Sequence, residues 1–164
     1  MTSYAEPIKT LVEQRIEKVN TLSPGVIRKV DLARWRANVQ LKYTIQGVTL
    51  NLTDVPIALQ NWKTGALHIA PTVGDVVLVG FSKYEIQKQL RNRDIVPVNE
   101  LVLHNLAHAV ILGGIHVESD TVPDLQAAGE ILISHKSGSY IKFTEDGYID
   151  IGTPQKIRMK KVSS

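Results

Sequence analysis

The segment Glu130–Gly152, EILISHKSGSYIKFTEDGYIDIG, decides how this sequence folds. Within it and just beyond it, apolar residues recur in pairs, and the two members of each pair are two positions apart. The pairs are Ile131/Ile133, Ile141/Phe143, Ile149/Ile151 and Ile157/Met159, spaced by 10, 8 and 8 residues. Because side chains two positions apart lie on the same face of a strand, each pair predicts a short β-strand with one apolar face. Turn-forming residues between the pairs predict a meander.

Such a meander cannot be stable by itself, since four strands of about five residues bury only one narrow apolar row each. The rows must therefore pack on the rest of the chain or on copies of the same segment. Three copies around a threefold axis would place all the rows in one core, as a trimeric β-prism with few free edges. We expect this trimer, and the alternative is a sheet folded back on its own chain. The predicted trimer core consists of Ile131, Ile133, Ile141, Phe143, Ile149, Ile151, Ile157 and Met159.

Residues 23–117, which precede this segment, have the pattern of a small β-barrel. Apolar and polar residues alternate through 36–45, and Gln46–Gly47 then predicts a hairpin turn into a strand at 48–52. The most apolar run, 76–81, predicts a central strand. Further strands are predicted at 26–32, 95–103 and 109–115, with a break at 23–25, a polar loop at 61–65 and a short helix or excursion at 82–90. This density of short strands favours a closed barrel.

The N-terminus predicts an amphipathic α-helix over about residues 4–20. Ser3–Glu6 fits a capping box, and Pro7 lies in the first turn, where proline is tolerated. Apolar residues then recur at spacings of three and four. They are Ile8, Leu11, Val12, Ile16 and Val19. This apolar stripe must pack on the barrel of its own chain or on a partner, and both remain open. The expected domains are 1–22, 23–117 and 118–164, the last with a linker and the prism.

The composition excludes several classes of protein. With no Cys among 164 residues, the chain cannot form disulfides, thiolate zinc sites, iron–sulfur clusters or a Cys nucleophile. Hydrophobic residues make up 43%, enough for a folded core, and the net charge of +3 is only mildly basic. The N-terminus lacks the features of a signal peptide. The longest uncharged stretch, 101–117, is too short and too polar for a membrane helix, so we expect neither secretion by a signal peptide nor a membrane span.

The sequence carries little that indicates catalysis. His104 and His108 have the spacing of two zinc ligands on one helix face, but Asn105 stands where such a site needs its general-base Glu. His68, His116 and His135 are predicted in turns or on the surface. No phosphate-binding loop and no nucleophile elbow is present. We therefore expect no catalytic, cofactor or metal site, and no cofactor.

A different function is suggested by Trp35, which lies between Arg34 and Arg36. A small barrel with basic and aromatic side chains on one face can bind single-stranded nucleic acid. The barrel's other aromatic residues are spread over different elements, so nucleic acid is not expected as a partner. A nucleic-acid-binding module with an oligomerisation tail remains the alternative function.

Three stretches, in this order, carry a resemblance to a known family. They are Pro71–Val79 (PTVGDVVLV), His108–Gly114 (HAVILGG) and Gly129–Ile141 (GEILISHKSGSYI). With a barrel followed by a β-prism, the chain resembles the central spike, or membrane-piercing, proteins of contractile phage tails and related injection machines. The resemblance implies a mainly β fold with an N-terminal α-helix, an OB-fold-like barrel and a short intertwined β-prism or β-helix formed as a trimer.

The resemblance also implies a structural role in the virion tail baseplate, assembled in the host cytoplasm. The homotrimer would lie below a hub protein, with the helix face of residues 8–19 docking to the hub. On contraction it would make transient contact with the target envelope. Family members often hold iron at their tip through a His-x-His pair, which this sequence lacks. Either a separate tip protein would then cap the spike from below, or the machine would need only a blunt plug.

Overall fold

The structure, a computed structural model, describes residues 21–62, 65–91, 93–97, 105–120 and 128–157. The predicted N-terminal helix, with its docking face, lies outside the described residues. The chain divides into two compact units, 1–117 and 118–164, and each is described by itself. Antiparallel strands dominate both units, which confirms the prediction of a mainly β protein.

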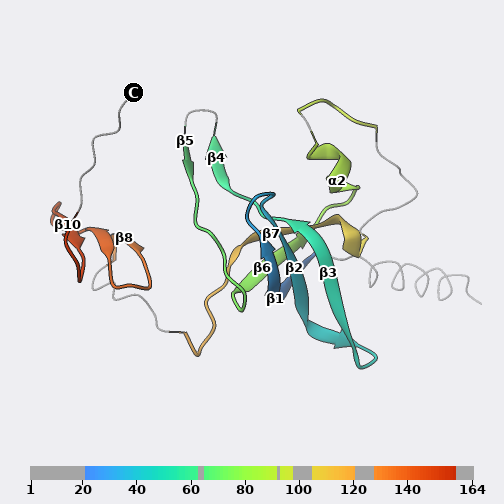
Figure 1. The fold of residues 1–164 in the computed structure, drawn as a ribbon, viewed down its shortest axis with the longest axis horizontal. Coiled ribbons are helices and arrows are strands. Elements are labelled where there is room, and N and C mark those ends of the chain that lie inside the picture. The colour runs from blue at the N-terminus through green and yellow to red at the C-terminus, as the bar shows by residue number, and fades with distance from the viewer. Residues whose placement is uncertain (1–20, 63–64, 92, 98–104, 121–127, 158–164) are drawn as a thin grey trace, which may run out of the picture. The chain divides into compact units, whose positions relative to one another are not determined.

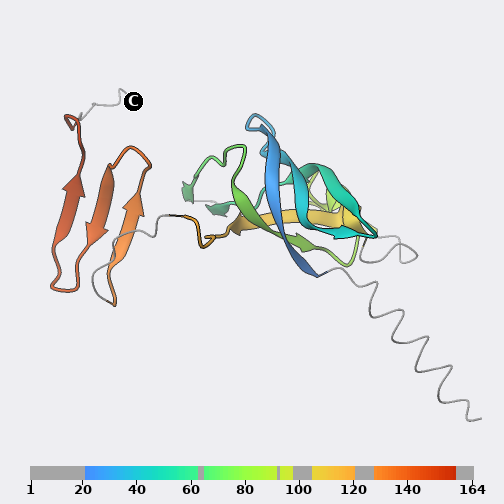
Figure 2. The same cartoon turned by 90° about the horizontal axis from the view of Figure 1, so that it is seen from below.

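The first unit is built on one five-stranded antiparallel sheet (Figure 1). Its elements are β1 (Leu22–Asp31), β2 (Arg36–Ile45), β3 (Val48–Pro56), β4 (Gln60–Trp62), β5 (Gly65–Leu67), β6 (Val76–Phe81), α2 (Ile86–Gln89), the 3-10 helix η1 (Leu106–His108) and β7 (Ala109–Gly114). The strand order is β3-β2-β1-β6-β7, and β4 and β5 form a separate hairpin. Ile57, directly after β3, makes a parallel bridge with Ile111 of β7, so the two edges of the sheet meet. The sheet therefore curves round and closes on itself (Figure 2).

Alternate residues of these strands fill the interior of the first unit. Ile27 of β1 and Val79 of β6 are fully buried, at 0% exposure. On β2, Ala37, Val39 and Leu41 point inward, because successive side chains of a strand point to opposite faces. The other buried apolar residues of the core are Leu52, Val55, Val77, Ala109 and Ile111.

Several local predictions for the barrel are confirmed. Strands β2 and β6 begin and end where the alternation predicted them, at 36–45 and 76–81. Gln46 and Gly47 form the hairpin turn with positive φ angles of 51° and 77°, the combination of a type I′ turn. Strand β7 also forms in its predicted place, at 109–114.

Other predictions were wrong. The first strand, expected at 26–32 after a helix break at Ser23–Gly25, begins earlier, so that Ser23–Gly25 lie inside β1. Gly25 is needed there because β2 approaches closely: a Cβ on Gly25 would lie 2.4 Å from Val39 Cγ1. The predicted polar loop at 61–65 contributes instead to the β4–β5 hairpin. The described part of the expected strand at 95–103, residues 95–97, is not a strand, and Ile95 is fully exposed with no strand beside it.

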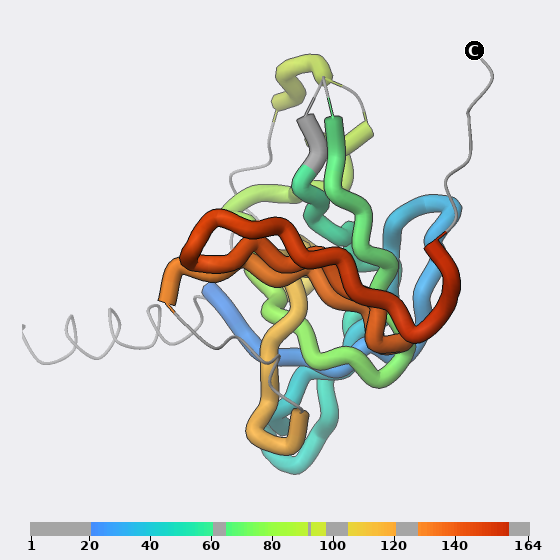
Figure 3. Tube along the Cα trace, turned by 90° about the vertical axis from the view of Figure 1, so that its left-hand side faces the viewer, coloured from blue at the N-terminus to red at the C-terminus, as the bar shows by residue number. Residues whose placement is uncertain are grey.

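The second unit contains a three-stranded antiparallel meander. Its strands are β8 (Ile131–Ser134), β9 (Tyr140–Phe143) and β10 (Ile149–Gly152), in the order β10-β9-β8. Gly138 and Gly147 occupy the two connecting turns with φ of 83° and 88°, a conformation that favours glycine. The strands form a single layer, side by side in Figure 2 and one behind another in Figure 3. Three of the four predicted strands are thus confirmed. Ile157 lies outside any strand, and Met159 lies outside the described residues.

Candidate oligomerisation face

One face of the meander carries six apolar side chains. Across the ladders, Ile131 is paired with Phe143, and Phe143 with Ile149. The second row is Ile133, Ile141 and Ile151, again in direct register. Because directly paired residues point to the same side, these six side chains form two parallel apolar rows. We call this surface the apolar face.

Within the described residues of the second unit, nothing packs over the apolar face. Its six side chains are between 39% and 60% exposed, whereas the core residues of the first unit are at most 7% exposed. Ile157, predicted to extend this surface, is also exposed. Contiguous exposed apolar surface of this kind marks a site of interaction with protein or membrane. The structure therefore brings together the described members of the predicted trimer core, with Ile157 beside the strands.

The opposite face of the same sheet carries contacts within the chain. Lys142 Nζ lies 2.8 Å from Glu130 Oε2, and these side chains are only 14% and 7% exposed. The ring of Tyr140 lies over Gly152. A Cβ at position 152 would therefore come within 2.2 Å of Tyr140 Cε1. The charged side chains of this opposite face thus pair within their own unit.

One end of the apolar face borders a row of hydroxyl groups. A pocket of about 360 Å³ lies there, lined by Ile133, Ile141, Ile151 and Ile157 together with polar residues. The Oγ of Ser139 is 3.1 Å from Thr153 Oγ1 and 3.3 Å from Ser137 Oγ. This apolar surface with a polar margin has the anatomy of a protein–protein interface.

Of the two histidines considered for metal binding, the structure describes only His108. His108 lies on η1, at the start of β7, and not on an α-helix, so its predicted spacing to His104 does not create a shared helix face. Its side chain is buried, and its Nδ1 has no hydrogen-bond partner among the described residues. His104 lies outside the described residues. In the described part of the chain, no three His, Cys, Asp or Glu side chains are grouped as they would be around a metal ion.

Trp35 has an unusual position at the end of the β1–β2 hairpin. Its φ of 49° lies in the left-handed region, and its ring meets that of His68 edge to face, with centroids 5.3 Å apart. Asp54, which the sequence analysis did not single out, also has a positive φ, of 55°, and binds both Arg34 and Arg36. The sequence signal for it was weak: one acidic residue near the end of a predicted strand.

Comparison with known proteins adds no relative. No family model matches the chain, and a search of curated proteins finds no match either. Among the described residues, no helix has both the length and the apolar character needed to cross a membrane.

Proposed function

We propose that this chain is a structural spike protein that works as a homotrimer, with the apolar face as the trimer core. The proposal rests on one observation: six apolar side chains form two rows on one face of a three-stranded sheet, and no described residue of the second unit packs over them. Burial of apolar surface stabilises by about 25 cal/mol per Å². Association is therefore the way in which this sheet gains a core.

Three copies suit this sheet better than one. A lone sheet of three four-residue strands has no second layer to cover it. Three meanders around an axis would turn all apolar faces inward and all polar faces outward, which agrees with the Lys142–Glu130 pair on the outer side. A prism of this kind would be rigid and slow to unfold, as a mechanical part needs to be.

The first unit supports the same proposal. The two edges of its main sheet meet where Ile57, directly after β3, bridges to Ile111 of β7, and β1 pairs with both β2 and β6. This arrangement is compatible with an OB-fold-like barrel, the domain that the resemblance implies above the spike. We propose that the chain belongs to the baseplate of a contractile tail or a related injection machine. There it would cap the tube, dock to a hub and help to pierce the target envelope.

The mass of the purified protein tests the trimer. Light scattering is expected to give the mass of three chains. Ile141→Asp and Ile151→Asp are each expected to yield monomers, because three carboxylates would meet in one dry core. Tyr148→Asp is the matched control, since Tyr148 is 68% exposed and lies outside the apolar face. A wild-type monomer or dimer contradicts the proposal, and so does a trimer that survives both substitutions.

The proposed hub contact has its own test. Removing residues 1–20 is expected to leave a folded trimer that no longer assembles with the hub. Assembly that survives this deletion would mean that the apolar stripe of residues 8–19 belongs to the chain's own core.

A further inference from the structure

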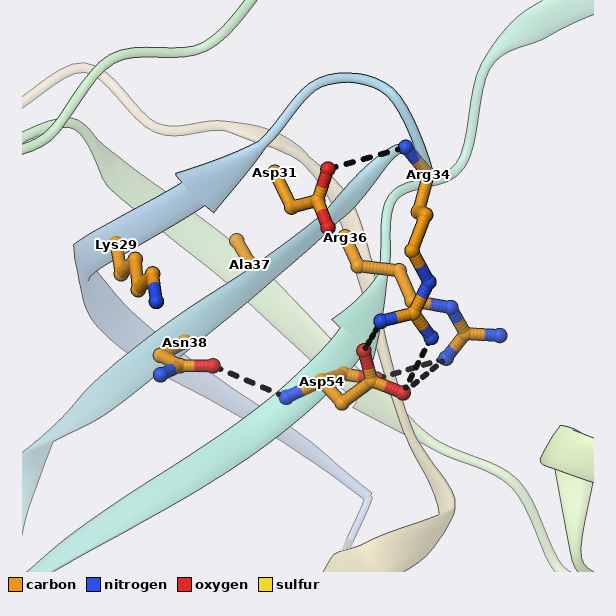
Figure 4. A pocket seen from close by; sticks show the side chains of 7 residues that line it. All are labelled: Lys29, Asp31, Arg34, Arg36, Ala37, Asn38 and Asp54. Carbon is orange, nitrogen blue, oxygen red and sulfur yellow. Dashed lines mark hydrogen bonds and ion pairs between the residues drawn. The ribbon is translucent and has the colours of Figure 1, made fainter.

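A charged pocket lies on the first unit, separate from the apolar face. It has a volume of about 130 Å³ and lies between the ends of β1 and β2 and the Asp54 region of β3 (Figure 4). Its lining consists of Lys29, Asp31, Arg34, Arg36, Ala37, Asn38 and Asp54. Figure 4 shows Lys29 on one side of the pocket and the two arginines on the other, with Ala37 between them.

Both carboxylates of the pocket are already bound within the chain. The two oxygens of Asp54 lie 3.1 and 3.2 Å from Nη1 and Nη2 of Arg34, and Arg36 Nη1 is 3.2 Å from Oδ2. Asp31 Oδ1 accepts a hydrogen bond from the backbone N–H of Arg34 at 3.2 Å. Asp31 and Asp54 therefore hold the arginines in position. Because the Asp54 carboxylate is already paired with two arginines, the pocket is a poor site for a cation.

Donors remain on the basic side chains. All the hydrogen bonds of Arg36 go through Nη1, so its Nη2 and Nε have no acceptor in the described part of the chain. The side chain of Lys29 has neither an ion pair nor a hydrogen bond with any described residue. The arrangement thus offers one free ammonium group and one half-used guanidinium group to a ligand.

The pocket is held in shape before any ligand arrives. Asp54 has a φ of 55°, opposite a register shift in the β2–β3 ladder, and its N–H donates to Asn38 Oδ1 at 3.1 Å. Gln87 of α2 donates to the Asp54 carbonyl at 3.3 Å, and so does Arg36 at 2.8 Å. Bulges and left-handed residues of this kind cluster at functional sites. Arg36 is only 17% exposed, so little side-chain freedom is lost on binding.

Charge and size together define the ligand. The lining of the pocket carries three basic and two acidic side chains, a net charge of +1, so the pocket attracts anions. A volume of about 130 Å³ accommodates a carboxylate, whereas pockets for drug-sized ligands start at about 300 Å³. No aromatic side chain lines the pocket, although single-stranded nucleic acid is bound by stacking on aromatic rings.

We propose that this pocket docks an acidic segment of a partner protein, with Lys29 and Arg36 binding its carboxylate groups. The inference does not depend on the trimer, because every residue that it uses lies in the first unit.

Fluorescence anisotropy of a labelled octaglutamate peptide with the full-length protein tests this proposal. Binding is expected at low ionic strength, to weaken with added salt, and to be absent for octaglutamine. Lys29→Gln is expected to weaken binding about fivefold, in the range of a partly exposed charge pair. Lys42→Gln is the matched control, because Lys42 is an exposed lysine of β2 that does not line the pocket.

Three results would overturn the proposal. One is the absence of octaglutamate binding. Another is an equal loss in Lys29→Gln and Lys42→Gln, which would mean attraction by overall charge. The third is tighter binding of an eight-nucleotide thymidine strand than of octaglutamate, with that binding lost in Lys29→Gln, which would make the pocket part of a nucleic-acid surface.

Discussion

Tyr140 and Gly152 face each other directly across the β9–β10 ladder, and the tyrosine ring lies over the glycine. A methyl group at position 152 would come within 2.2 Å of Tyr140 Cε1, so the ring would have to swing out. We expect Gly152→Ala to destabilise the meander by about 1–2 kcal/mol, the usual cost of overpacking. Hydrogen exchange of the β10 amides measures this loss.

The control for this substitution is a double-mutant cycle. In a Tyr140→Ala background the ring is absent, so Gly152→Ala is expected to cost much less there. An equal cost in both backgrounds would place the effect in the backbone of residue 152 and contradict the role of the ring.

Local alternation explains which parts of the fold the sequence could predict. Strands β2 and β8–β10 have apolar side chains at every second position, and this signal depends only on neighbours in the chain. Gly25 shows where such reasoning fails. Its residue type signals a turn, but its role is to let β1 approach Val39, and that contact exists only once β2 is in place.

The two functional surfaces differ in the same way. The apolar face was predictable because the members of each pair lie two residues apart on one strand. The charged pocket was not predictable, because Asp54 lies 20 residues from Arg34 and 18 from Arg36 in the sequence. Their contact depends on the register shift between β2 and β3, and the alternation of apolar and polar residues does not predict such a shift.

The β2–β3 turn offers a stabilising substitution. Gln46 has a φ of 51°, a conformation that costs an ordinary L-residue about 1–2 kcal/mol and that Asn tolerates far better. With Gly47 at a φ of 77°, an Asn at position 46 would give the preferred Asn-Gly sequence of a type I′ turn. We expect Gln46→Asn to raise the free energy of unfolding by about 0.5–1 kcal/mol, as measured by urea denaturation followed by tryptophan fluorescence.

Gln46→Ala serves as the control at the same position. It removes the same side-chain amide but brings no preference for the left-handed region, so it is expected to be no more stable than the wild type. If Ala stabilises as much as Asn, the gain does not come from the turn.

The Lys142–Glu130 ion pair is expected to stabilise the second unit. Both side chains are mostly buried and their charges lie 2.8 Å apart. Lys142→Met alone is expected to destabilise the second unit by up to about 3 kcal/mol, because it removes the cation that lies 2.8 Å from a buried carboxylate. The double substitution with Glu130→Gln is expected to recover part of this loss. Hydrogen exchange of β9 distinguishes the two variants, and a double variant no more stable than the single one would contradict this account.

The two units should respond differently to removal of an isoleucine. Ile27 is fully buried inside the barrel, so Ile27→Ala is expected to lower the free energy of unfolding of the first unit by about 3 kcal/mol. Because that core lies within one chain, the loss should be the same at every protein concentration. Tryptophan fluorescence reports on it, since both tryptophans, Trp35 and Trp62, belong to the first unit.

Ile133, in contrast, is 49% exposed and belongs to the proposed trimer core, so its loss is expected to weaken the association of chains. We expect Ile133→Ala to leave the first unit unchanged and to raise the concentration at which the trimer dissociates, so that the melting temperature of the meander depends more steeply on concentration. Light scattering and hydrogen exchange of β8 over a dilution series measure this shift. A meander whose stability is independent of concentration, in both the wild type and Ile133→Ala, would mean that the apolar face is covered within one chain.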